Sequence, residues 1–375
     1  MKRLVLALGL LVSTAAAFAV TFESEPAAGR TALGSEHRHG NAGTAKHERY
    51  LYVATIAQSP SDPDFVAIVG ADPSRADFGS IVGRVDMPNV GDELHHFGYS
   101  TDQRRLVVPG LFSNRIDVLG IRGDGRTLQV DAVNEELAAR SGYVTPHTVV
   151  ATSGSKAIVT MIGAATADTT PGGIVEIDTV TGSFTSHFGP APARGADALG
   201  PASMYDFHWL HDANYGISTT FGPPALCGGG IDPTCLGSEV AVWDVRNRKV
   251  IHTADLGAGS GALEVRFIER HKVRRAFINT PGTSAVWLAD DDDHDGVFDF
   301  QQVLGPEDGL VIPADMLPSY DSRYMYVTNW FVTPCSSSTS PTRSGRSSTR
   351  PSPCRIRTCC GSRGTTRGCT SRTRC

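Results

Sequence analysis

Two adjacent histidines, His95 and His96, are the residues of this chain whose types and spacing suit metal chemistry. They follow Asp92 and Glu93 in the run GDELHHFGY, which brings carboxylates and imidazoles close together along the chain. Neighbouring side chains of a regular strand point to opposite faces, so both histidines can face one site only from a bend or from the first residue of a strand. The alternative is one buried, hydrogen-bonded histidine and one exposed histidine.

Similar polar residues recur further along the chain. Each time, they stand at the start of a new group of short apolar segments. Each group contains short apolar runs separated by Gly, Pro, Asp or Asn, which predicts hairpin-connected strands. The repeating register predicts the four-stranded blades of a β-propeller, whose innermost strands line a central channel. The leading polar side chains then meet around one axis, where they either ligate a transition metal or hydrogen-bond one another. They are Glu93, His95, His96, His147, Asp206, His208, Glu264 and Asp315.

The composition of residues 49–331 predicts one all-β domain with almost no helix. Only residues 133–141 favour a helix, and then for one or two turns. A domain of this length can bury a substantial core.

The first residues predict an exported protein, periplasmic or secreted. A short basic start precedes the apolar run 4–12, and Ala17-Phe18-Ala19 forms a cleavage site, so residues 1–19 read as a signal peptide. The apolar run is too short to span a bilayer, and no later segment predicts a stable membrane anchor. Residues 20–48 lack any apolar period and predict a flexible lead-in.

Several short motifs match one known family in order along residues 50–331. The chain resembles the selenium-binding protein family, which includes bacterial methanethiol oxidases. The resemblance implies a seven-bladed β-propeller. The matching motifs are MPN at 87–89, GDELHH at 91–96, PHT at 146–148, YDF at 205–207, VWD at 242–244 and LEVRF at 263–267.

The resemblance also implies a copper centre and the oxidation of methanethiol by dioxygen to formaldehyde, hydrogen sulfide and hydrogen peroxide. His95, His96 and His147 match the family's histidine motifs and are the expected copper ligands. Imidazoles hold copper firmly, and a soft thiolate can take an open position on the metal. The expected catalytic acids are Glu93, Asp206 and Glu264; the last two match acidic positions of the family and would orient ligands or accept protons.

The chain also departs from the family. Val149, Val150 and Ala151 follow the PHT motif, where the family commonly has a second histidine and a cysteine. His208 stands where the family often has an aromatic residue, so it is either a compensating ligand or a core residue. No cysteine occurs in residues 50–58, so selenium binding through a cysteine there is not expected.

Two loop features carry separate predictions. Asp291, Asp293, Asp295 and Asp299 alternate as in a calcium loop, with glycine at the sixth position, although Gln302 replaces the final glutamate. The sequence is compatible with calcium binding at this loop and equally with a solvated acidic hairpin tip. Cys227 and Cys235 predict a local disulfide in an oxidising compartment.

Residues 332–375 differ from everything before them. They contain nine arginines, six cysteines and no acidic residue. The change falls within a predicted strand, so we interpret the segment as a disordered tail read out of frame, which replaces the last blades. A role in binding nucleic acid is not expected.

Two functions of different classes therefore stand as hypotheses. The first is a copper-dependent thiol oxidase. The second is a non-catalytic exported propeller that binds selenium, another soft ligand or a protein partner.

Overall fold

The computed structural model describes residues 48–164, 167–188, 204–222, 236–268, 274–319, 322, 324–330, 355–359 and 373–374. Strands dominate, with one α-helix, α1 (Leu137–Ser141), and one 3-10 helix (Pro306–Asp308). The predicted all-β chain with a short helix near residues 133–141 is therefore confirmed. No helix within these ranges is long and apolar enough to cross a membrane. The predicted signal peptide, nearly all of the lead-in, and Cys227 and Cys235 lie outside the described residues.

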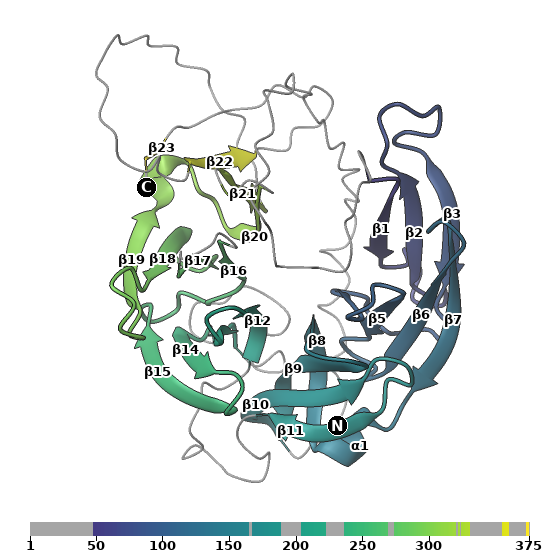
Figure 1. The fold of residues 1–375 in the computed structure, drawn as a ribbon, viewed down its shortest axis with the longest axis horizontal. Helices are drawn as coiled ribbons and strands as arrows, with labels where there is room; N and C mark the ends of the chain where they lie inside the picture. Colours follow the sequence, from purple (N-terminus) through teal and green to yellow (C-terminus); the bar gives the residue numbers. More distant parts are fainter. Residues whose placement is uncertain are drawn as a thin grey trace, which may run out of the picture.

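The strands form six sheets around a central axis (Figure 1). The first sheet contains β1 (Tyr50–Thr55), β2 (Phe65–Gly70) and β3 (Ile81–Asp86). The second contains β4 (Gly98–Tyr99), β5 (Arg105–Pro109), β6 (Ile116–Arg122) and β7 (Thr127–Asn134), and the third contains β8 (Tyr143–Ala151), β9 (Lys156–Ala164), β10 (Ala167–Asp178) and β11 (Phe184–Phe188).

The remaining sheets continue the same pattern. The fourth contains β12 (Met204–Leu210), β13 (Tyr215–Thr220), β14 (Glu239–Asp244) and β15 (Lys249–Asp255). The fifth contains β16 (Val265–Phe267), β17 (Arg275–Thr280), β18 (Ala285–Asp290) and β19 (Asp299–Leu304). The sixth contains β20 (Pro313–Pro318), β21 (Tyr324–Asn329), β22 (Arg355–Cys359) and β23 (Thr373–Arg374).

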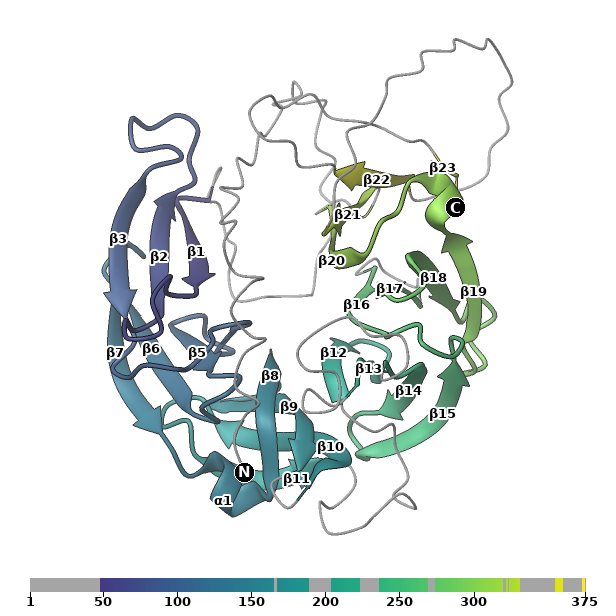
Figure 2. The same cartoon turned by 180° about the vertical axis from the view of Figure 1, so that it is seen from behind.

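The sheets have the blade arrangement that the sequence register predicts. In each of the second to fifth sheets, consecutive strands pair antiparallel, as when Val107 in β5 pairs with Val118 in β6. Strands β8, β12, β16 and β20 lie nearest the centre, while β15 and β19 lie at the outside (Figures 1 and 2). The elements that begin with these polar residues are thereby brought toward the centre of the arrangement.

The first and sixth sheets differ from the others. The first has three strands, and on the free side of β1 no described strand pairs with it. In the sixth, β22 pairs parallel with β21, whereas every other described pair of neighbouring strands is antiparallel. Strands β22 and β23 come from the arginine-rich segment 332–375, most of which lies outside the described residues. The described sheets follow an arc, and β22 and β23 are strands within the segment that the sequence predicted to be a disordered tail. The replacement of the last blades by this segment stays a prediction.

Apolar side chains between neighbouring sheets form the core. Between the fourth and fifth sheets, Val242, Phe267 and Ile278 belong to one fully buried cluster. Burying a side chain such as Phe267 stabilises the fold by about 2–3 kcal/mol. This packing fixes the inner strands rigidly and so positions the polar residues that they carry.

Asp117 is an ionisable residue buried among the apolar side chains. It lies in β6, it is completely buried, and neither of its carboxylate oxygens has a hydrogen-bond partner among the described residues. Burial and the nearby charge of Asp92 raise its pKa to about 7, although Arg115 opposes the shift. The folded protein therefore keeps the Asp117 proton at pH values where the unfolded chain has lost it.

We expect this group to make the protein less stable as the pH rises. Between about pH 4, where an unfolded aspartate titrates, and about pH 7, the folded state binds more protons, so the free energy of unfolding falls by up to about 1.4 kcal/mol per pH unit. Asp117→Asn should remove this slope, as measured by urea unfolding at several pH values. Asp62→Asn, on an exposed turn, is the control and should keep it. An unchanged slope in Asp117→Asn would assign the titration to another group.

Candidate metal centre

A bend before β4 brings His95 and His96 to the same side of the chain. Glu93 has a left-handed backbone with φ 56°, and the N–H of Leu94 donates to the buried carboxylate of Asp64 at 3.0 Å. The two imidazoles are stacked, with ring centroids 5.2 Å apart. A regular strand would point the two rings to opposite faces. The bend is therefore what allows both histidines to face one site.

His147 approaches the pair from the next blade. It lies in β8, where Thr145 has φ 62° and the pairing with β9 shifts register between Pro146 and Val149. Its ring centroid is 4.2 Å from that of His96 and 5.0 Å from that of His95. One nitrogen from each ring lies within 4.8 Å of the others, which is close enough for all three to bind one ion.

All three histidines are held in the neutral form that ligates metals. His147 is completely buried, and burial followed by the charges of His96 and His95 lowers its pKa well below the ordinary value. Burial likewise lowers the pKa of His96. The side chain of His95 keeps contact with solvent, but the protein atoms around its ring, and then the charge of His96, lower its pKa to about 4. Neutral imidazoles offer lone pairs at neutral pH.

Tyr205 forms an aromatic wall of this site, a role that the sequence did not predict. It lies in β12, its ring centroid is 3.8 Å from that of His147, and its hydroxyl lies 3.2 Å from Nε2 of His95. Burial, then the charge of Glu264, raises the pKa of Tyr205 well above the ordinary value, so the phenol keeps its proton. Its position directly before Asp206 in the YDF motif was the only signal in the sequence.

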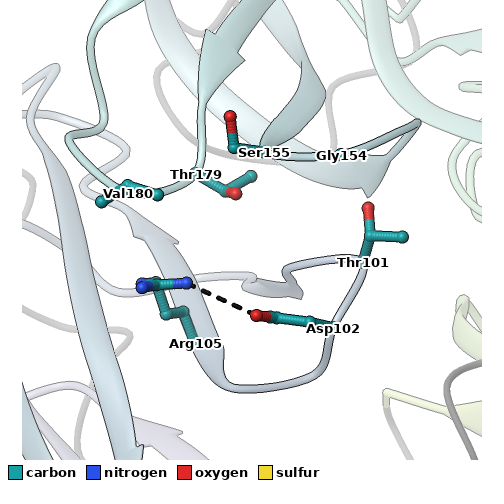
Figure 3. Close-up of a pocket in the computed structure, with 7 residues that line it drawn as sticks. All are labelled: Thr101, Asp102, Arg105, Gly154, Ser155, Thr179 and Val180. Carbon is teal, nitrogen blue, oxygen red and sulfur yellow. Dashed lines mark ion pairs between the residues drawn. The ribbon is translucent and has the colours of Figure 1, made fainter.

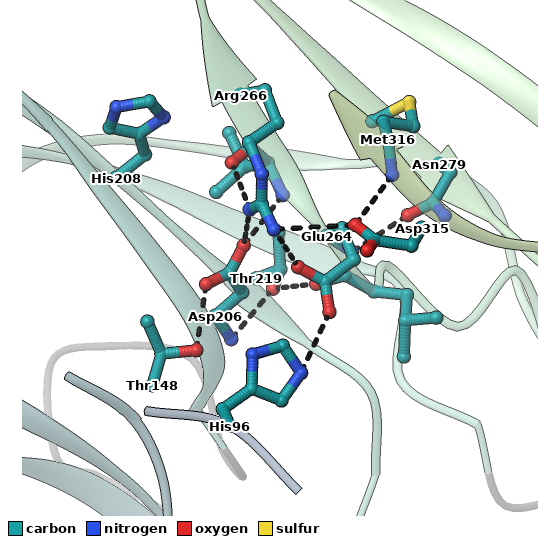
Figure 4. A network of polar contacts seen from close by, with 12 residues as sticks. His96, Thr148, Asp206, His208, Thr219, Glu264, Arg266, Asn279, Asp315 and Met316 are labelled. Atoms are coloured by element: carbon teal, nitrogen blue, oxygen red, sulfur yellow. Dashed lines mark hydrogen bonds and ion pairs between the residues drawn. The ribbon is translucent and has the colours of Figure 1, made fainter. Parts of the chain in front are cut away.

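Behind the histidines, Arg266 binds three carboxylates from three blades (Figure 4). Its Nη1 lies 2.6 Å from Oδ2 of Asp206, and its Nη2 lies 2.6 Å from Oε2 of Glu264 and 3.4 Å from Oδ1 of Asp315. Asp206 and Glu264 are each about 1% exposed. The sequence predicted the acids but not the arginine, although it alternates with Glu264 in the LEVRF motif.

The two buried acids of this cluster differ in protonation. Burial would raise the pKa of Asp206, but Arg266 and the N–H of Val265, which donates to it at 2.9 Å, outweigh this and hold its pKa well below the ordinary value. Burial and the charge of Asp206 raise the pKa of Glu264 well above its ordinary value. Glu264 lies 3.5 Å from Nε2 of His96. The centre therefore places an aspartate whose charge Arg266 stabilises beside a glutamate whose buried environment favours its protonated form.

Two predicted residues do not join the histidine cluster. His208 accepts a hydrogen bond from the N–H of Phe267 at its Nδ1 and packs edge-on against that ring, and Figure 4 shows it apart from His96. This is the arrangement of a core histidine. Glu93 makes no hydrogen bond or ion pair with the three histidines among the described contacts, although burial raises its pKa.

The predicted calcium loop gathers three of its four aspartates. Carboxylate oxygens of Asp291, Asp293 and Asp295 lie within 4.8 Å of one another, whereas Asp299 lies in β19 and is not part of the group. Asp291 also pairs with Arg274 at 2.8 Å, and this cation competes for the same carboxylate. Calcium binding at this loop stays a prediction.

A shallow cavity lies apart from these residues, between turns of the second and third blades (Figure 3). Its volume is about 610 Å³, and Asp102, Arg105 and Thr179 are among its lining residues. No residue that the sequence predicted for the site lines this cavity.

Known proteins resemble the chain in sequence and in fold. The sequence model of the 56-kDa selenium-binding protein family (SBP56) matches residues 36–335. A methanethiol oxidase from Danio rerio is 28% identical over 319 residues, covering 74% of this chain and 63% of the relative. A selenium-binding protein 2 from Mus musculus is 25% identical over 306 residues, covering 74% and 60%. The chain thus spans less than two thirds of the length of these curated relatives.

A solved structure shows the same fold. The crystal structure of a hypothetical selenium-binding protein from Sulfolobus tokodaii superposes with a TM-score of 0.67 at 25% identity, covering 76% of this chain and 70% of that one. The match supports the blade arrangement described above.

Proposed function

Because the chain belongs to the SBP56 selenium-binding protein family, we propose that it oxidises a small thiol, methanethiol, at a copper centre held by His95, His96 and His147. The proposed reaction converts methanethiol, dioxygen and water to formaldehyde, hydrogen sulfide and hydrogen peroxide. The convergence of the three imidazoles carries the proposal. The relatives named methanethiol oxidase support the choice of substrate.

The residues at the centre fit copper. Neutral imidazole nitrogens are good ligands for copper, zinc, iron and nickel. Nε2 of His147 is buried and has no hydrogen-bond partner among the described residues, which suits an atom whose partner is a metal. Copper, unlike zinc, changes its oxidation state and so can pass electrons from a thiol to dioxygen.

The chain's own residues would bind the thiol and manage its proton. The solvent access at His95 leaves one side of the cluster open to a small substrate. Tyr205 packs against His147, with its hydroxyl beside Nε2 of His95, and shields the rings on its side of the cluster from water. Glu264 lies beside His96 in an environment that favours its protonated form, and the ionised Asp206 next to it balances the charge of Arg266. These acids would orient the histidines and exchange protons with the site.

The proposal predicts that thiol consumption follows copper content. The purified full-length chain would be stripped of metal, loaded with graded amounts of copper, and assayed for methanethiol loss and peroxide formation. Both rates should rise in proportion to bound copper, and a zinc-loaded sample should be inactive because zinc has no redox chemistry. A sample with one copper per chain that leaves methanethiol untouched would reject the oxidase. Tight copper binding without turnover would instead favour the alternative, a non-catalytic propeller that binds soft ligands or a protein partner.

A further inference from the structure

The two ring nitrogens of His147 lie in unequal environments. Nδ1 lies 3.1 Å from the hydroxyl of Thr148, whereas the buried Nε2 has no partner among the described residues. A neutral imidazole carries its proton on one nitrogen only, and the hydrogen bond at the other nitrogen decides which. Whether the Thr148 hydroxyl donates to Nδ1 or accepts from it therefore determines which lone pair His147 can offer.

The single proton of the Thr148 hydroxyl determines the direction of its hydrogen bond with Nδ1 of His147. The hydroxyl has one hydrogen and three polar neighbours: Oδ1 of Asp206 at 2.7 Å, the carbonyl oxygen of Tyr205 at 3.4 Å, and Nδ1 of His147. The first two can only accept, because Asp206 is ionised and a carbonyl has no hydrogen. The short contact to the carboxylate is the stronger one, so the hydroxyl donates there. Its oxygen is then left to accept from His147, which carries its hydrogen on Nδ1. The hydrogen bond between His147 and the backbone of Tyr205 favours the same position, because Nε2 has no partner among the described residues.

Asp206 is fixed firmly enough to impose this direction. Its Oδ2 accepts from Arg266 at 2.6 Å and from the N–H of Val265 at 2.9 Å, which leaves Oδ1 facing Thr148. The N–H of Thr148 donates to the hydroxyl of Thr160 at 2.9 Å, so the backbone of Thr148 is anchored as well. The chain His147–Thr148–Asp206 is thus built from rigid parts on two blades.

We propose that Thr148, held by Asp206, is a positioning residue that fixes His147 in the Nδ1–H tautomer and presents its Nε2 lone pair to the metal. The inference rests on the proposed function only where copper is concerned, since the tautomer belongs to the metal-free protein. A carboxylate that orients a metal-binding histidine usually contacts the ring directly. In this chain a hydroxyl stands between the two.

The first test needs no metal. Multiple-bond proton–nitrogen NMR of metal-free protein carrying ¹⁵N-histidine reports which ring nitrogen is protonated, and the His147 signals are identified by their loss in His147→Gln. We expect the Nδ1–H tautomer in the native chain and in Thr148→Ser, which keeps the hydroxyl. Thr148→Val, which has a similar shape but no hydroxyl, should lose the preference for it. Finding Nε2–H in the native metal-free chain would overturn the inference whatever the variants do.

The second test measures copper affinity by chelator competition. Thr148→Val should bind copper about 10–100-fold more weakly than the native chain, and Thr148→Ser should restore most of the loss. If Thr148→Val unfolds at the same midpoint as the native chain and binds copper with native affinity, the Thr148 hydroxyl does not position His147. A native chain that shows the Nδ1–H tautomer but binds no copper would reject the proposed function and leave the tautomer assignment standing.

Discussion

Replacing His147 with alanine is expected to abolish tight copper binding and methanethiol oxidation while the propeller stays folded. His147 is the completely buried member of the three-histidine cluster and contacts both other rings. Its loss removes one ligand outright, which should weaken copper binding by more than the roughly 10–100-fold that follows loss of an outer hydrogen-bond partner. Chelator competition and the electron paramagnetic resonance spectrum of bound copper would measure the change. Thermal unfolding of the metal-free variant would report on the fold.

Two other histidine variants serve as controls for His147→Ala. His252→Ala, on the outer strand β15, is the matched control and should bind copper like the native chain. His208→Gln should also keep copper, because Nδ1 of His208 already accepts from Phe267. Native copper affinity in His147→Ala, or a clear loss in His208→Gln, would contradict the assigned ligand set.

The sequence predicted the fold because the blades repeat. A polar residue leads each inner strand and an apolar strand follows, so one register places Asp206 in β12 and Asp315 in β20 before any coordinates are known. The fourth strands, such as β7, alternate between exposed and buried residues and carry a weaker pattern. The parallel pairing of β22 could not be predicted, because nothing in an arginine-rich, cysteine-rich segment specifies a strand partner.

The site was predicted in part, and the limit is physical. The register places His95, His96 and His147 among the polar residues that lead the inner strands, and the family resemblance selects these three as the expected ligands. Neither shows that a left-handed residue, Glu93, makes the bend that aligns the first pair. The contact of Tyr205 with His147 joins residues from two blades, and it depends on packing that no local pattern encodes.

His208 is the residue that the sequence left open, as either a compensating ligand or a core residue. Its place in the register suited a ligand, because residues two apart on a strand share a face. The pairing of β12 with β13 shifts register between Met204 and Phe207, so the simple alternation from Asp206 to His208 is not a safe guide there. Its Nδ1 instead satisfies a backbone N–H of the next blade.

Arg266→Met is expected to be among the most destabilising single substitutions in the protein. Removing the arginine leaves the buried, ionised Asp206 without its counter-ion and leaves Glu264 and Asp315 without their common partner. Breaking a buried ion pair in this way costs about 3–5 kcal/mol, because one charge remains buried and uncompensated. Urea unfolding at pH 7 should show the loss. Arg75→Met, which removes a surface pair with Asp77, is the control and should cost far less.

The loss in Arg266→Met should also depend on pH, and this dependence separates charge from packing. Without the guanidinium, burial dominates and the pKa of Asp206 rises above that of an unfolded aspartate. The variant's folded state then binds the extra proton, so its stability falls as the pH rises from about 4, and the deficit relative to the native chain should be smaller at pH 5 than at pH 8. A deficit that is equal at both pH values would mean that Arg266 acts through its packed side chain and not through its charge.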